Sequence, residues 1–162
     1  MTSYPDFLPS LLNLDGRWEE IFKRLYSVFS NDFKTGKVFH RGFIVLYDGR
    51  ILPDGQGKEE GFWHVISRID RSNRGREIDF RRAERLPWAR PLMESPPRSE
   101  ILVFDHSEGP KDKGQRRYIW LEQFDYVLIM QKKKRVFFWV TAFYIDSEWK
   151  RRDLRKKFGE RL

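Results

Sequence analysis

The first apolar pattern in the chain has the period of an α-helix. From Trp18 to Phe29, apolar residues recur every three or four positions, as on the buried face of an amphipathic helix. Asp15 stands just before this stretch, where its side chain can cap a helix N-terminus. Residues 1–14 come before it as a lead-in segment. The pattern therefore predicts a first helix that is capped by Asp15.

A strand and an ambiguous segment follow this helix. The apolar run 43–47 predicts a strand, and Asp48-Gly49 behind it is a signal for a hairpin turn. Residues 52–61 have the composition of a loop. The segment FWHVISRI, residues 62–69, fits a strand or a helix.

A short helix is expected after the next polar link. Asp79 is placed to cap a helix that runs through Arg85, and Pro87 and Pro91 then interrupt it. Residues 15–100 are thus predicted to form a half of the protein that consists of helices and one hairpin.

The second half, residues 101–162, has the pattern of a β-meander followed by a helix. The expected strands are 101–104, 117–121, 126–131 and 136–145. Short links between them favour antiparallel pairing. Both faces of the last strand are apolar, so we expect it at the centre of the sheet, covered on both sides. Ser147 is placed to cap a closing basic helix through Phe158, with Gly159 as its stop.

These elements predict an α+β fold in a single domain, residues 1–162. N-terminal helices come first, then a four-stranded antiparallel sheet, then a basic C-terminal helix. A length of 162 residues fits one compact domain. An aromatic content of 16% argues against disorder, because such a chain can bury enough apolar surface to offset the entropy of folding.

The composition excludes several classes of protein. There is no cysteine, which excludes disulfides, zinc–thiolate sites and thiol nucleophiles. The longest apolar run, 136–145, is much shorter than the roughly 20 residues of a membrane helix. The N-terminus has no basic stretch followed by an apolar one, unlike a signal peptide. We therefore expect a soluble, cytoplasmic protein with no membrane partner.

Charge is distributed unevenly along the chain. The net charge is +8, yet residues 1–66 hold 8 basic against 9 acidic residues, and residues 67–162 hold 24 against 15. Clustered basic residues attract polyanions, of which nucleic acid is the commonest in a cytoplasm, and aromatic side chains can stack on bases. A basic surface that only aids solubility is the alternative.

His64 is the first candidate for chemistry. Of three histidines, it alone lies in an aromatic, apolar stretch after a glycine-rich loop. Arg68 follows four residues later, a spacing that places both side chains on one face of a helix or of a strand. A histidine beside a cation can act as a general base while the cation binds a phosphate. A packed histidine with one satisfied hydrogen bond is the alternative.

The run RRAER, residues 81–85, is the second candidate. Arg82 and Arg85 are three residues apart on the expected helix and could bind one phosphate together. A solvated helix face paired with Asp79 and Glu84 is the alternative.

Thr141 interrupts an otherwise apolar strand. By alternation it lies on the face of Phe137, Trp139 and Phe143. Its hydroxyl must be satisfied there, or it faces a cleft.

Further basic residues are expected to hold a nucleic-acid backbone, and those of the terminal helix to position it rather than to perform chemistry. They are Arg81, Arg82, Lys133, Lys150, Arg151, Arg155, Lys156 and Lys157. Metal chemistry has little support, because the histidines are scattered and no paired-carboxylate spacing occurs. We therefore expect no metal ion and no other cofactor.

Four segments together resemble a known family. FWHVISR, RRAERLPW, YIWLEQFDYVLIM and VTAFYID, the last followed by a basic helix, are similar to a phage-associated branch of the barnase–EndoU–colicin–RelE (BECR) ribonuclease and toxin superfamily. The resemblance extends over residues 38–158. It implies a BECR-like fold, with helices before a four-stranded antiparallel sheet, and metal-independent cleavage of RNA.

The resemblance also implies roles for particular residues. The histidine of the family matches His64 and its strand threonine matches Thr141, while Arg68 and Arg85 are the best positions for its basic residues. His64 would remove the proton of a ribose 2′-hydroxyl, and the arginines would stabilise the transition state. Thr141 would donate a hydrogen bond to a phosphoryl oxygen or to His64. No second histidine is obvious as the general acid, so the sequence leaves the general acid unassigned.

The sequence thus predicts a metal-independent RNA endonuclease of phage or mobile-element type, with a toxin or RNA-processing role. One alternative is a non-catalytic nucleic-acid-binding module. Another is an interaction protein whose basic face docks an acidic inhibitor or antitoxin. A metal-dependent nuclease is the third.

Overall fold

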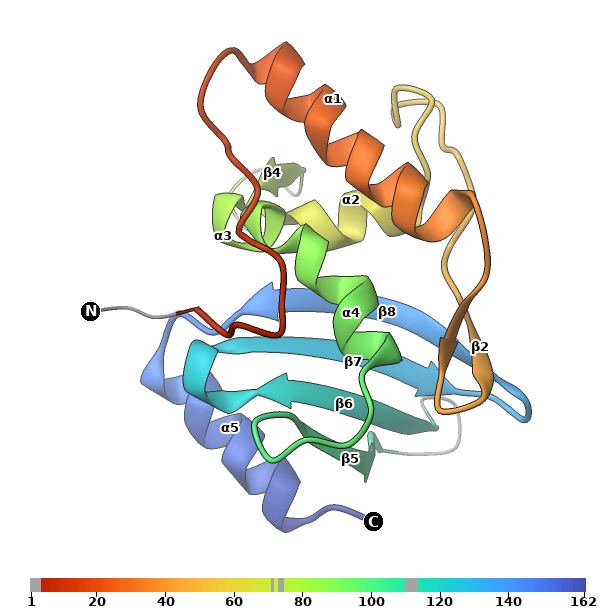
Figure 1. The fold of residues 1–162 in the computed structure, drawn as a ribbon, viewed down its shortest axis with the longest axis vertical. Coiled ribbons are helices and arrows are strands. Elements are labelled where there is room, and N and C mark those ends of the chain that lie inside the picture. Colours follow the sequence, from red (N-terminus) through yellow and green to blue (C-terminus); the bar gives the residue numbers. More distant parts are fainter. Residues whose placement is uncertain (1–3, 71, 73–74, 110–113) are drawn as a thin grey trace.

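The computed structural model describes residues 4–70, 72, 75–109 and 114–162, which form a central sheet with helices on both sides (Figure 1). On one side lie α1 (Trp18–Phe29), α2 (Glu60–Ile66), α3 (Phe80–Glu84) and α4 (Ala89–Glu94). Helix α5 (Glu148–Gly159) lies on the other side. Among the described residues, no helix is both long and apolar enough to cross a membrane.

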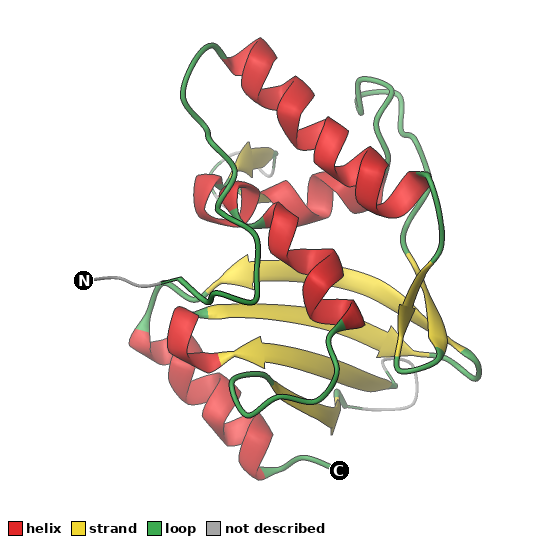
Figure 2. Cartoon of the chain, in the orientation of Figure 1, coloured by secondary structure: helices red, strands yellow, loops and turns green. Residues whose placement is uncertain are grey.

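The main sheet is mixed (Figure 2). Within the described part of the chain its strands are β1 (Val38–His40), β2 (Phe43–Leu46), β8 (Val136–Tyr144), β7 (Tyr126–Lys132), β6 (Gln115–Leu121) and β5 (Leu102–Ser107), in this spatial order. Strand β2 pairs parallel with β8, and all other neighbours are antiparallel. A separate two-stranded ribbon consists of β3 (Ser67–Ile69) and β4 (Arg76–Ile78).

The predicted α+β class is confirmed, but a four-stranded antiparallel sheet is not what forms. Strands β5 to β8 do pair antiparallel in chain order. The β1–β2 hairpin then widens the sheet at the edge of β8 and makes it mixed. The parallel pair joins Ile44 to Val136, and turn signals along a sequence do not report such distant pairings.

The turn of the β1–β2 hairpin falls at Arg41-Gly42, so the prediction of a hairpin turn at Asp48-Gly49 is wrong. Arg41 and Gly42 have φ angles of 49° and 90°. Two successive residues with positive φ form the tight turn that fits the twist of a hairpin. Asp48 instead accepts hydrogen bonds from the side chain of Arg50 in the loop after β2, at 2.6 and 2.9 Å.

Two apolar cores lie on the two sides of the sheet. The larger core is between the sheet and the helices α1 to α4, and it contains Phe29, Phe62 and Trp88. The smaller core lies under α5, where Leu154 packs with Tyr118 of β6. Strand β8 contributes to both cores, as expected for a strand that is covered on both sides.

A β-bulge changes which side the residues of β8 face. Trp139 pairs with Met130 and Thr141 with Ile129, so Val140 is the extra residue of the bulge. Because directly paired residues project to the same side, Thr141 shares the side of Ile129 rather than that of Trp139, at the edge of β8 that α2 and α3 contact. The prediction that Thr141 shares the face of Trp139 is wrong, because strict alternation cannot report a bulge.

The helix ends follow local signals in two cases and depart from them in two others. Asp79 caps α3 and Ser147 caps α5 through side-chain hydrogen bonds to backbone amides, as predicted. Helix α1 begins after Arg17 without a side-chain cap, so the cap at Asp15 is wrong. Pro91 lies in the first turn of α4, where its missing N–H is not needed, and it does not interrupt a helix.

Candidate functional site

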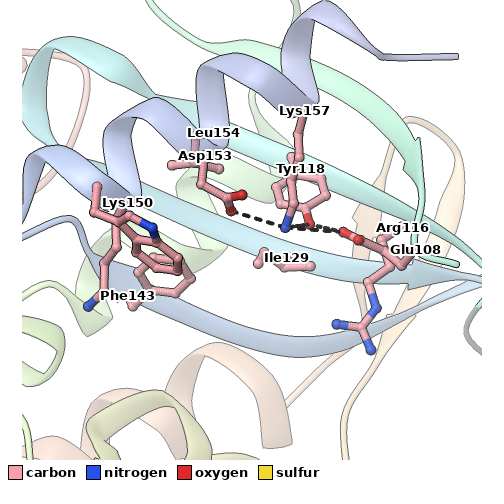
Figure 3. Close-up of a pocket in the computed structure, with 10 residues that line it drawn as sticks. Glu108, Arg116, Tyr118, Ile129, Phe143, Lys150, Asp153, Leu154 and Lys157 are labelled. Atoms are coloured by element: carbon pink, nitrogen blue, oxygen red, sulfur yellow. Dashed lines mark hydrogen bonds and ion pairs between the residues drawn. The ribbon is translucent and has the colours of Figure 1, made fainter.

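The basic residues predicted to hold RNA do not gather at one place. Lys150, Arg151, Arg155, Lys156 and Lys157 are on α5, Arg81 and Arg82 are on α3, and Lys133 lies in the turn between β7 and β8. Carboxylates already bind several of them. Arg151 donates two hydrogen bonds to Asp125, both of 2.9 Å, and Lys157 lies 3.3 Å from Asp153 (Figure 3). These paired cations of α5 are therefore less available to RNA phosphates than the composition of the helix indicates.

The ambiguous segment 62–69 is a helix followed by a strand. Helix α2 ends at Ile66 and β3 begins at Ser67, so His64 and Arg68 belong to different elements. A spacing of four residues places two side chains on one face only when both belong to the same helix or strand. His64 and Arg68 do not, so their spacing does not bring their side chains together. Arg68 is 51% exposed and donates a hydrogen bond to Glu77 at 2.9 Å.

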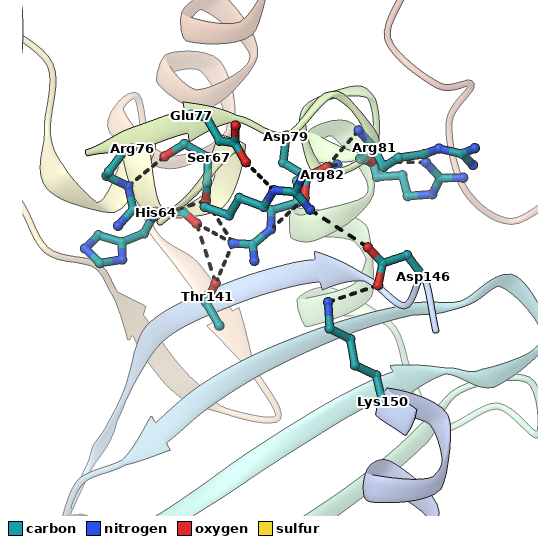
Figure 4. A network of polar contacts seen from close by, with 12 residues as sticks. His64, Ser67, Arg76, Glu77, Asp79, Arg81, Arg82, Thr141, Asp146 and Lys150 are labelled. Atoms are coloured by element: carbon teal, nitrogen blue, oxygen red, sulfur yellow. Dashed lines mark hydrogen bonds and ion pairs between the residues drawn. The ribbon is translucent and has the colours of Figure 1, made fainter. Parts of the chain in front are cut away.

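Four elements meet at the C-terminal end of α2 (Figure 4). Arg82 of α3 donates from Nη1 to the carbonyl oxygens of His64 and Ser67, at 3.3 and 2.9 Å. The hydroxyl of Thr141 on β8 lies 3.5 Å from both the His64 carbonyl and Arg82 Nη1. Arg82 thus holds the last carbonyl groups of α2 against the edge of β8.

Arg76 of β4 brings a second cation to the same place. Its guanidinium donates to the hydroxyl and the carbonyl oxygen of Ser67, at 2.7 and 3.1 Å. His64, Ser67, Arg76, Arg82 and Thr141 are called the His64 site below.

The His64 site has more positive than negative charge. Burial lowers the pKa of the Arg76 and Arg82 guanidinium groups from the ordinary arginine value. Arg82 has one carboxylate beside it, that of Asp79, at 3.4 Å from Nε. In the described part of the chain, Arg76 makes no ion pair. Partly desolvated cations with so few counter-charges favour an anionic ligand.

The imidazole of His64 is half-buried and free. Burial lowers its pKa, and the positive charge of Arg76 lowers it further. Its ring points away from Thr141 (Figure 4), so Thr141 contacts the backbone of His64 rather than the ring. The structure shows no hydrogen bond to the ring nitrogens from any described residue. A neutral imidazole of this kind can accept a proton at neutral pH.

Arg85 is not part of the His64 site. Its side chain is 5% exposed and pairs with Glu84 at 2.6 Å. Its guanidinium lies over the rings of Tyr144 and Trp88, at 4.4 and 5.3 Å from their centres. These contacts give Arg85 a packing role, and the cations beside His64 are Arg76 and Arg82. Arg76, the last residue of the polar link 71–76, carries no local signal that could single it out in the sequence.

A cavity of about 490 Å³ adjoins the network. Its lining includes Arg68, Arg81, Arg151, Asp79 and Asp146. Arg68 and Arg81 are therefore near the His64 site without touching the imidazole.

The other two histidines belong to other parts of the fold. His40 is buried under α4, where Nδ1 lies 2.8 Å from the carbonyl oxygen of Met93 and burial lowers its pKa. His106 of β5 lies 3.5 Å from Glu108. Neither contacts a member of the His64 site in the described residues, so no second imidazole accompanies His64 there.

No group of three or more His, Asp or Glu among the described residues could hold a metal ion.

Comparisons of this chain with protein-family models, with curated proteins and with solved structures find no match. The resemblance to the BECR superfamily therefore stays a prediction, and the geometry of the His64 site is what supports a function.

Proposed function

We propose that the His64 site binds the phosphodiester backbone of RNA and cleaves it without a metal ion. The observation that supports this is the half-buried imidazole of His64, to which no described residue donates a hydrogen bond, close to the partly buried guanidinium groups of Arg76 and Arg82. A phosphodiester supplies the negative charge that these groups lack. Guanidinium groups also match the geometry of phosphate oxygens.

The chemistry follows from these positions. His64 takes the proton of a ribose 2′-hydroxyl, and the 2′-oxygen attacks the adjacent phosphorus. The bond from phosphorus to the 5′-oxygen breaks, and this oxygen takes a proton from water. The products are a 2′,3′-cyclic phosphate and a 5′-hydroxyl. Arg76 and Arg82 stabilise the charge on the phosphoryl oxygens. DNA has no 2′-hydroxyl and is not cleaved.

For Thr141, Arg68 and Arg81 we propose roles that differ from those expected from the sequence. Thr141 positions Arg82 and the backbone of His64 through its two 3.5 Å contacts. Arg68 and Arg81, which line the adjoining cavity, are placed to contact neighbouring phosphates. On the sequence resemblance alone, we propose a toxin or RNA-processing role of phage or mobile-element type.

Binding of RNA without cleavage is the second candidate. The observation that favours it is the absence, in the described residues around His64, of a second imidazole that could act as a general acid. A binding module would use the same arginines but would leave RNA intact.

Incubation of the purified protein with cellular RNA in the presence of EDTA tests the proposal. We expect discrete fragments from the wild type and from the matched control His106→Ala, and intact RNA with His64→Ala. A gel shift should show that His64→Ala still binds RNA. Cleavage that survives in His64→Ala would contradict the proposal, and a shift without fragments from the wild type would favour the binding module.

A further inference from the structure

A second cavity, of about 330 Å³, lies on the α5 side of the sheet (Figure 3). Ile129, Phe143 and Leu154 form an apolar part of its lining. Trp149, at the start of α5, also lines it and is 69% exposed. The exposed indole and the apolar lining beside it offer a surface on which a flat aromatic group can stack.

Phe143 and Ile129 link this cavity to the neighbourhood of the His64 site. The Arg82 guanidinium lies 5.7 Å from the centre of the Phe143 ring, and Phe143 lines the cavity. Thr141 pairs directly with Ile129, which lines it as well, so both project to the same side of the sheet. A chain molecule bound at Arg82 would therefore reach the cavity by passing Thr141 and Phe143.

The two basic side chains Lys157 and Arg116 of the cavity lining differ in whether a neighbouring group already binds them. Lys157 lies 3.3 Å from Asp153 and 3.2 Å from the hydroxyl of Tyr118, so its charge is already partnered. The side chain of Arg116 has no ion pair or hydrogen bond among the described residues, and its Nε is buried without a partner. Arg116 is thus a cation in the lining whose charge no described carboxylate partners.

We propose that this cavity is a nucleobase subsite for single-stranded RNA. An unpaired base stacks on the indole of Trp149 and packs against Phe143, and Arg116 binds the phosphate next to that base. A base inside a duplex is stacked between its neighbours and cannot enter, so the subsite selects single strands. This subsite rests on the proposed function, because it extends the path of the RNA from the His64 site.

Binding of a labelled single-stranded oligonucleotide with 2′-O-methyl riboses tests the subsite without cleavage, because the 2′-oxygen cannot act as a nucleophile. Trp149→Ala should weaken binding roughly tenfold, the effect of removing one base-stacking contact. Arg116→Gln should weaken binding and reduce its dependence on salt. The matched control is Trp18→Ala, which removes a 39% exposed tryptophan from α1 and should leave affinity unchanged. A duplex of the same sequence should bind the wild type and Trp149→Ala equally.

The outcomes separate this subsite from the proposed catalysis. Equal affinity of the wild type and Trp149→Ala for the single strand overturns the subsite, even if His64→Ala abolishes RNA cleavage. Binding that depends on Trp149, in a protein that leaves all RNA intact, supports the subsite while the catalytic proposal fails. Both tryptophans are exposed, so thermal unfolding of the two variants should match that of the wild type and exclude misfolding as a cause.

Discussion

The backbone carbonyl oxygen of His64 lies 3.5 Å from the hydroxyl oxygen of Thr141, although 77 residues separate them in the chain. The contact joins the end of α2 to a part of β8 that lies beyond its pairing with β2. Arg82 reaches both groups from α3, at 3.3 and 3.5 Å. Two helices and a strand thus share one set of polar contacts, which fixes the backbone that carries the proposed catalytic base.

Thr141→Val tests the role of this hydroxyl, since valine keeps the shape and removes the polar atom. The contacts are long, so the free energy of unfolding should fall by less than about 1 kcal/mol. RNA cleavage should fall roughly tenfold, because Arg82 and His64 lose a positioning contact. Urea unfolding and initial cleavage rates measure the two effects. A variant with wild-type activity would show that the hydroxyl has no positioning role.

Arg82→Gln should destabilise the fold more strongly. Arg82 is mostly buried and satisfies the carbonyl oxygens of His64 and Ser67 at the end of α2. Loss of these charge-assisted bonds should lower the free energy of unfolding by about 2 kcal/mol. Arg81→Gln, an exposed neighbour on the same helix, is the matched control and should change it by less than about 0.5 kcal/mol. Equal effects of the two substitutions in urea unfolding would count against the capping role of Arg82.

Asp79 has two functions that a pair of substitutions can separate. Its carboxylate accepts hydrogen bonds from the amides of Arg81 and Arg82, both at 3.1 Å, and lies beside the Arg82 guanidinium. Asp79→Ala should cost about 1 kcal/mol of stability through loss of the cap, whereas Asp79→Asn keeps a good cap and should retain most of it. Chemical denaturation of both variants checks this, and an equal loss would mean that the charge rather than the cap is what stabilises α3.

Arg76→Gln should change the pH dependence of cleavage. Burial is the main cause of the lowered His64 pKa, and the positive charge of Arg76 lowers it further. Removal of that charge raises the pKa, so His64 becomes protonated at a higher pH. The acidic limb of the kcat/KM profile should therefore move upward, while it stays below about 6.5 because burial remains. A downward shift would exclude His64 as the base.

His40 should make stability depend on pH. The residue is 1% exposed, and burial lowers the pKa of its imidazole. As the pH falls through about 6.5, the unfolded chain gains a proton at His40 that the folded protein does not, so the free energy of unfolding falls. His64 contributes with the same sign. Urea unfolding at about pH 7.5 and about pH 5.5 should show a smaller difference for His40→Gln than for the wild type. A difference of the same size would mean that His40 is not a source of this dependence.

The parts of the fold that the sequence predicts well depend on residues close together in the chain. The caps at Asp79 and Ser147 are side-chain bonds to amides two or three residues away. The order of strands β5 to β8 follows from apolar runs separated by short turns. The local composition around His64 singles it out, and the structure leaves its half-buried ring without a hydrogen bond from a described residue.

The parts that the sequence could not predict depend on distant contacts. The bulge at Val140 turns Thr141 to the other side of the sheet, and only pairing with β7 shows it. Arg76 reaches the site because β4 pairs with β3. Arg85 was expected on a phosphate, but Tyr144, from the far end of the chain, covers its guanidinium. The spacing of residues along one helix does not show which side chains from distant parts of the chain will cover them.

Mass spectrometry of the cleavage products of a defined oligoribonucleotide, made in EDTA, tests most directly whether His64 activates a 2′-hydroxyl. Wild-type protein should give fragments that end in a 2′,3′-cyclic phosphate, and a single 2′-deoxy substitution at the cleaved position should block the reaction there. His64→Ala should reduce the rate by at least about a hundredfold. Fragments with 5′-phosphate ends, or cleavage at the 2′-deoxy position, would contradict this mechanism.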